Sequence, residues 1–147
     1  MEAKLLTADR FVDKKTGCSY RYILSDTEYF RPHYHDYYEI FILLEGNANH
    51  LVNGKLVPLK ANDMVFIRPS DTHDYASCNG KTFSMLNITF TAETAEQIFT
   101  FLGKGFPSET LKTVKLPPIV RLNSGEFSAL NDRMTAIGTI SSEDYCR

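Results

Sequence analysis

The sequence lacks a strong charge of either sign, and this lack excludes several functions. Its 16 lysines and arginines nearly balance its 18 aspartates and glutamates, which gives a formal net charge of -2 at pH 7. A domain that binds nucleic acid or anionic lipid through its own charge needs a basic patch or stripe. We therefore expect no DNA-binding or membrane-binding surface on this chain.

Cysteines and long apolar runs are also scarce. The three cysteines, Cys18, Cys78 and Cys146, are widely spaced and include no CxxC pair of the kind that binds metal or exchanges disulfides. The longest apolar run, residues 40–44, is too short to cross a membrane, and the amino-terminal residues do not resemble a secretion signal. These features favour a cytoplasmic protein with reduced thiols.

What the sequence does contain is a set of short β-strand patterns in its first two thirds. The chain has 147 residues, 43% of them hydrophobic, which suits one compact domain. Residues 18–24, 37–44, 64–67 and 82–90 favour strands, and Asn53-Gly54 predicts a type I′ hairpin between two further apolar runs. Many short strands separated by turns predict a mainly β sandwich or barrel.

After Thr91 the pattern becomes helical. Thr91 can cap a helix over residues 92–102, Gly103 ends it, and prolines at 107, 117 and 118 allow only a short helix and an extended connection. Asn123 and Glu126 form a capping box at the start of a further helix. That helix carries an apolar stripe, which fits either its own barrel or a seam between two subunits: Phe127, Leu130, Met134 and Ile137.

A metal site is the most specific chemical signal in the sequence. In the stretch HYHDYYEI, residues 33–40, the side chains of His33, His35 and Glu39 fall on one face of an extended strand. His73 follows another strand and a polar turn that can return it to the same cavity. Imidazole nitrogen and carboxylate oxygen are ligands for Zn, Ni, Fe or Mn. For any one of these histidines the simpler interpretation is a hydrogen-bonding aromatic residue, but four such residues together favour a divalent metal.

Aromatic side chains near this group predict a ligand pocket. Binding pockets at barrel openings combine aromatic walls with a few polar groups. We expect Tyr37, Phe41 and Phe66 to flank the four candidate ligands and to contact a bound small molecule. His50, the remaining histidine, is expected to face solvent on its strand.

The spacing of the candidate ligands resembles the first cupin motif. His33-x-His35-x3-Glu39-x6-Gly46 matches that motif from its first histidine to its closing glycine. In the second motif His73 keeps its place, and Asn62 is a mild replacement for a glycine because asparagine tolerates a left-handed turn. The sequence departs from the motifs at several further positions: Thr27, Arg68, Ser70 and Ser77.

More broadly, the chain resembles the amino-terminal domain of AraC/XylS-type transcription regulators, most like those of chitooligosaccharide (chitobiose) operons. The resemblance rests on HDYYEI at 35–40, VNGKLVPL at 52–59 and NDMVFIRPSDTH at 62–73. It implies a cupin barrel with an N-terminal arm over residues 1–91 and a helical segment over 92–147 that packs on the barrel and dimerises. It also implies a small-molecule effector, such as a chitooligosaccharide, and a helix-turn-helix DNA-binding domain downstream.

Two other interpretations fit the same residues. A small cupin metalloenzyme, a dioxygenase or a sugar-phosphate isomerase, would use the same histidines and glutamate around an open metal position. A storage or purely structural cupin would share the fold but leave the four residues without a role. The end of the sequence favours the regulator, because residues 142–144 resemble the start of another helix, so we expect further chain to follow.

Overall fold

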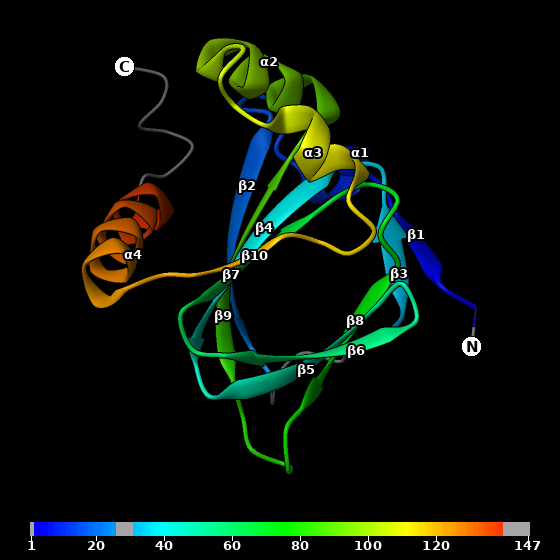
Figure 1. The fold of residues 1–147 in the computed structure, drawn as a ribbon, viewed down its shortest axis with the longest axis vertical. Helices are drawn as coiled ribbons and strands as arrows, with labels where there is room; N and C mark the ends of the chain where they lie inside the picture. Colours follow the sequence, from blue (N-terminus) through cyan, green and yellow to red (C-terminus); the bar gives the residue numbers. More distant parts are fainter. Residues whose placement is uncertain (1, 26–30, 140–147) are drawn as a thin grey trace.

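The computed structural model describes residues 2–25 and 31–139, and within them two sheets face each other and enclose a core (Figure 1). The first five-stranded sheet contains, in spatial order, β1 (Lys4–Leu6), β3 (His33–His35), β8 (His73–Ser77), β5 (Asn47–Val52) and β6 (Lys55–Lys60). The second contains β10 (Ile119–Arg121), β7 (Asp63–Ile67), β4 (Tyr38–Glu45), β9 (Ser84–Phe90) and β2 (Cys18–Leu24). The predicted mainly β barrel followed by helices is confirmed.

Turn chemistry at three positions sets the strand connections. Asn53 and Gly54 both have positive φ, 49° and 73°, as the predicted hairpin between β5 and β6 requires. Asn62 also has positive φ, 72°, in the turn before β7. Gly46, the closing glycine of the first cupin-like motif, has φ of 80°, and a Cβ there would lie 2.6 Å from the Thr82 carbonyl oxygen. A side chain at position 46 therefore does not fit.

Strand β4 is buried on both faces, which explains its nearly continuous apolar sequence. Phe41 and Leu43 point into the barrel, where residues of both sheets form the main core: Ile23, Ala48, Leu59, Val65, Ile67, Tyr75, Phe83 and Met85. Tyr38 and Ile42 point outward and belong to two other apolar clusters, which also contain residues of the helical segment.

The helical segment begins where the sequence predicts. Helix α2 (Ala92–Leu102) is capped by Thr91, whose hydroxyl accepts a hydrogen bond from the Thr94 amide. The short α3 (Ser108–Thr113) follows, and β10 then extends the second sheet beside β7, so residues 92–139 are not wholly helical. Helix α4 (Ser124–Thr139) starts with the predicted capping box, in which Asn123 and Glu126 exchange bonds of 2.8 and 3.0 Å.

The apolar stripe of α4 packs on the outer face of the second sheet. Met134 is 2% exposed and lies in a cluster with Ile42 and Leu86, while Phe127 and Leu130 pack against the same cluster. Within the described residues, the stripe thus contacts its own barrel. The side chain of Ile137 and the predicted helix start at 142–144 lie outside the described residues, as do Thr27 and Cys146.

The amino-terminal segment is part of the barrel wall. Strand β1 pairs in parallel with β3, so that Lys4 lies opposite His33 and Leu6 opposite His35. Helix α1 (Ala8–Phe11) follows, and the Ala8 amide donates to the Asp36 carboxylate at 2.6 Å. Among the described residues, no helix is both long enough and apolar enough to span a membrane.

Candidate functional site

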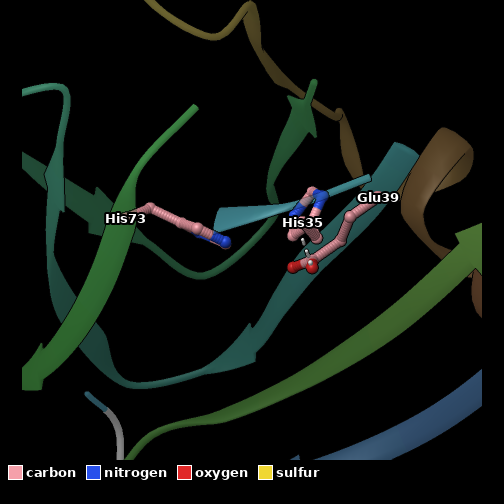
Figure 2. Close-up of side chains that lie close together, drawn as sticks. All are labelled: His35, Glu39 and His73. Atoms are coloured by element: carbon pink, nitrogen blue, oxygen red, sulfur yellow. Dashed lines mark ion pairs between the residues drawn. The ribbon is translucent and has the colours of Figure 1, made fainter. Parts of the chain in front are cut away.

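Three of the four predicted metal ligands meet inside the barrel. His35 comes from β3, Glu39 from β4 and His73 from β8, and Figure 2 shows their side chains pointing toward one another. One ligand atom from each of the three residues lies within 4.8 Å of those of the other two, and the three residues are only 1 to 3% exposed. Among the described residues, this is the group of three or more histidine, cysteine, aspartate or glutamate residues whose ligand atoms lie close enough together to hold one metal ion.

Hydrogen bonds fix which ring nitrogen of each histidine is available. His35 Nδ1 lies 2.6 Å from the Tyr37 carbonyl oxygen, which only accepts, so Nδ1 carries the proton. The Tyr75 hydroxyl donates to Glu39 Oε1 at 3.2 Å and therefore accepts from His73 Nδ1 at 3.1 Å. In both rings Nε2 is left as a bare lone pair with no hydrogen-bond partner among the described residues.

The charge states of these groups suit a cation. Burial raises the pKa of the Glu39 carboxyl, whereas protonation of the neighbouring His35, His73 or His33 imidazoles lowers it, and the net shift of that pKa is downward. Burial holds the pKa of His73 well below its usual value. At neutral pH Glu39 is thus a carboxylate and His73 is neutral, which are the forms that bind metals.

The distances also fit a metal ion. His35 Nε2 and Glu39 Oε2 are 3.5 Å apart, too far for a good hydrogen bond. Two ligands at about 2.1 Å from a tetrahedral metal would be separated by about 3.4 Å. Two orphaned imidazole lone pairs and a buried carboxylate, with ligand atoms that all lie within 4.8 Å of one another, are a suitable donor set for a divalent ion such as Zn, Ni, Fe or Mn.

His33 lies beside this group but does not complete it. Its ring centroid is 4.3 Å from that of His73 and 6.4 Å from that of His35. His33 Nδ1 is 2.7 Å from the Arg31 carbonyl oxygen, a contact that orients the ring. The predicted set of four is therefore reduced to three in this structure, with His33 at the edge of the adjoining cavity.

A cavity of about 280 Å³ adjoins the candidate metal group. Its walls include Glu39 and Tyr37, and the Tyr37 ring also stacks on His35 with centroids 4.3 Å apart. The other lining residues come from β1, β2, β9 and neighbouring segments: Lys4, Leu6, Phe11, Arg21, Ile23, Arg31, His33, Tyr75, Asn87 and Thr89.

The other two predicted pocket residues are placed differently. Phe41 is fully buried in the barrel core and stacks edge-on against Tyr75, so it supports the cavity wall without lining it. Phe66 was predicted at the cavity, but this prediction is wrong. Its ring points outward from β7 and packs with Tyr38 and Phe99 beneath α2.

His50 was predicted to face solvent on its strand, and this prediction is wrong. The residue is 0% exposed, with its ring stacked on Tyr75 and edge-on to Phe41. The signal was present in the alternation of β5, because Ala48 and Val52 lie two residues either side of it on the same buried face. Burial lowers the pKa of His50 to about 4, and neither ring nitrogen has a hydrogen-bond partner within the described chain.

Arg68 gives a physical reason for one departure from the cupin pattern. Its guanidinium forms two bonds of 2.8 Å to the Asp71 carboxylate, and both side chains are almost fully buried. It also donates to the carbonyl oxygens of Leu111 and Val114. Arg68 stands where the second cupin motif has a proline. It links the loop before His73 to α3 through side-chain hydrogen bonds that a proline cannot make.

Solved structures share this architecture. Two structures of ToxT from Vibrio cholerae align with TM-scores of 0.63 and 0.62, at 10% and 14% sequence identity. They cover 88% and 82% of this chain, and 51% and 46% of the ToxT chains. The first was solved with (E)-4-(8-methylnaphthalen-1-yl)but-3-enoic acid and the second with an unsaturated fatty acid.

Sequence comparison identifies the family. The HTH-type transcriptional activator RhaS of Yersinia pestis is 32% identical over 80 residues, which are 54% of this chain and 29% of the relative. RhaS of Yersinia pseudotuberculosis matches to the same extent, so the match spans less than a third of these relatives. Residues 19–135 match the AraC-like ligand binding domain. The chain belongs to this family of ligand-binding domains, and the names of the RhaS relatives, which are transcriptional activators, favour regulation over catalysis.

Proposed function

We propose that this domain is the effector-sensing part of a cytoplasmic transcription regulator, and that it binds a small sugar-like molecule in the barrel cavity. The observation that carries the proposal is the cavity itself, in which polar side chains of several strands converge beside a buried histidine and glutamate group. DNA contact would be made by a separate helix-turn-helix domain, as in the name of the RhaS relatives.

A divalent metal held by His35, Glu39 and His73 is the second part of the proposal. The bare Nε2 lone pairs of the two histidines and the Glu39 carboxylate support it. A bound metal would supply a positive centre that ligand oxygen atoms can approach. The domain's own residues would orient the effector through the cavity walls, which include His33.

Metal content tests this part directly. Purified protein should contain close to one divalent ion per chain after exposure to Zn, Ni, Fe or Mn, measured by inductively coupled plasma mass spectrometry. His35→Ala should lose most of that metal, because one of three ligands is removed and the others lose their alignment. His50→Ala removes a neighbouring buried histidine that is outside the group, and it should retain the metal. Equal metal content in wild type and His35→Ala would refute the site.

Effector binding is expected to alter the disposition of the N-terminal arm or the helical segment, and so the spacing of two attached DNA-binding domains in a homodimer. The contacts that support this coupling are those of β1 with β3 and of Arg68 with the carbonyl oxygens of Leu111 and Val114. Coupling requires the effector to bind two states with different affinity.

The test uses the longer regulator. Chitooligosaccharides and other small sugars would be titrated while the dimer dissociation constant and the operator affinity are measured at fixed salt. We expect at least one sugar to change one of these quantities. If sugars bind the domain but change neither quantity, the switch is refuted.

A further inference from the structure

We propose that the effector is a small hydroxylated anion, whose carboxylate or phosphate group is held by Lys4, Arg21 and Arg31 at one side of the barrel cavity. This inference rests on the proposed function, because it names the chemical class of the molecule that the cavity binds. It differs from that function in requiring a negative charge on the ligand, which a neutral sugar lacks.

The cavity wall has more cationic than anionic side chains. Among the described lining residues, Lys4, Arg21 and Arg31 are cationic, whereas Glu39 is the carboxylate. The chain as a whole is slightly acidic, with a net charge of -2. A cavity with more positive than negative side chains, in a protein of the opposite balance, favours an anionic ligand.

The three cations come from separate parts of the chain. Lys4 lies on β1, Arg21 on β2, and Arg31 just before β3. Arg21 and Arg31 also interact elsewhere in the chain, so the ligand would join existing contacts. Arginine is well suited to this role because its planar fork binds carboxylate or phosphate through two parallel hydrogen bonds.

Asn87 supplies a second, independent observation. Its side chain is 9% exposed and lines the cavity, and its Oδ1 atom has no hydrogen-bond partner among the described residues. A buried acceptor of this kind needs a donor, and a ligand hydroxyl provides one. The Thr89 and Tyr37 side chains lie on the same wall and offer further partners for hydroxyl groups.

The volume of the cavity and the apolar part of its wall further restrict which ligands fit. The cavity volume of about 280 Å³ lies near the lower limit of small-molecule pockets. Leu6, Phe11 and Ile23 contribute an apolar part of the wall, which suits the carbon face of a single sugar ring or a short carbon chain. The ligand is therefore about the size of a monosaccharide, with hydroxyl groups and one acidic group.

Isothermal titration calorimetry with matched sugars tests the inference. The probes are glucose and galactose, their uronates, and their 6-phosphates, with inorganic phosphate as a control, in EDTA so that bound metal plays no part. At least one acidic sugar should bind about tenfold or more tightly than its neutral parent. The uronate and phosphate arms then tell which acidic group is recognised.

Variants identify the residues responsible. Arg21→Gln and Lys4→Gln should each reduce the affinity for the acidic sugar by about tenfold and leave the neutral parent nearly unchanged. Both positions are exposed strand residues, and circular dichroism would verify folding. Arg133→Gln, which removes an exposed arginine of α4, is the matched control and should have no effect.

The outcomes separate this inference from the proposed function. If neutral sugars bind as tightly as acidic ones, or if acidic sugars bind equally well to Arg21→Gln and Lys4→Gln, the anionic ligand is refuted while the sugar-binding function stands. If inorganic phosphate alone binds as tightly as the sugar phosphates, the requirement for hydroxyl groups is refuted. If no probe binds, both the anionic ligand and a monosaccharide-sized effector are refuted.

Discussion

Replacing His50 with phenylalanine should make the domain less sensitive to acid. The His50 ring is stacked on Tyr75, at 4.9 Å and 10°, and lies edge-on to Phe41, so another aromatic ring suits the site. Neither His50 nitrogen has a hydrogen-bond partner within the described chain, so the substitution breaks no bond. Its main effect is to remove a buried group that binds protons.

The sign and size of the effect follow from the pKa of His50. Burial lowers that pKa from 6.5 to about 4, so below pH 6.5 the unfolded chain binds a proton that the folded chain resists. The folded state therefore loses stability as the pH falls from 6.5 to 4, and below pH 4 the loss is complete. Through this linkage, His50 lowers the free energy of unfolding by about 2 kcal/mol at pH 5 and by about 3 kcal/mol at pH 4.

Urea unfolding at pH 7, 6 and 5, with EDTA present, measures the effect. The free energy of unfolding of wild type minus that of His50→Phe should fall by about 2 kcal/mol between pH 7 and pH 5. The comparison cancels the titration of the shared groups that do not interact with His50. If the two stability curves stay parallel within about 0.5 kcal/mol, His50 is not buried in a neutral form, and the reasoning fails.

Three further substitutions test the packing by urea unfolding. Arg68→Met should lower the free energy of unfolding by about 3–5 kcal/mol, because it leaves the Asp71 carboxylate buried without its cation. A decrease below about 1 kcal/mol would contradict this. Met134→Ala should cost about 2–5 kcal/mol through a cavity under α4, and a loss that varies with protein concentration would indicate a subunit seam instead. Gly54→Ala should cost about 1 kcal/mol, since φ is 73° and no atom lies within 4 Å of the added Cβ; an unchanged stability would contradict this.

The turns and helix caps were predicted correctly because they depend on interactions between residues that are close in the sequence. The Asn53-Gly54 hairpin, the Thr91 cap and the capping box of Asn123 and Glu126 each depend on residues within four positions of one another. Their conformations are decided by short-range sterics and hydrogen bonds, so neighbouring residues suffice to find them.

Long-range packing explains the errors. Phe66 alternates with Val65 and Ile67, which point inward, so its ring points out beneath α2. The sequence of β7 is apolar on both faces and does not tell which face meets the cavity. His50 was misplaced because a polar residue type was given more weight than its apolar neighbours at positions 48 and 52.

The candidate site was predictable in composition but not in geometry. His35 and His73 come together because they lie on the paired strands β3 and β8, and Glu39 reaches them from β4 of the facing sheet. The position of His33 depends on a contact with the Arg31 carbonyl oxygen, which no spacing pattern records. The cationic wall was also missed, since Lys4, Arg21 and Arg31 are far apart in sequence and meet only in the folded barrel.

The parallel pairing of β1 with β3 has a practical consequence for handling the protein. Lys4 and Leu6 belong to the lining of the cavity, so trimming the first six residues would leave that chamber open along one side. Preparations that lack residues 1–6 are thus expected to report weaker effector affinity than preparations in which β1 is intact.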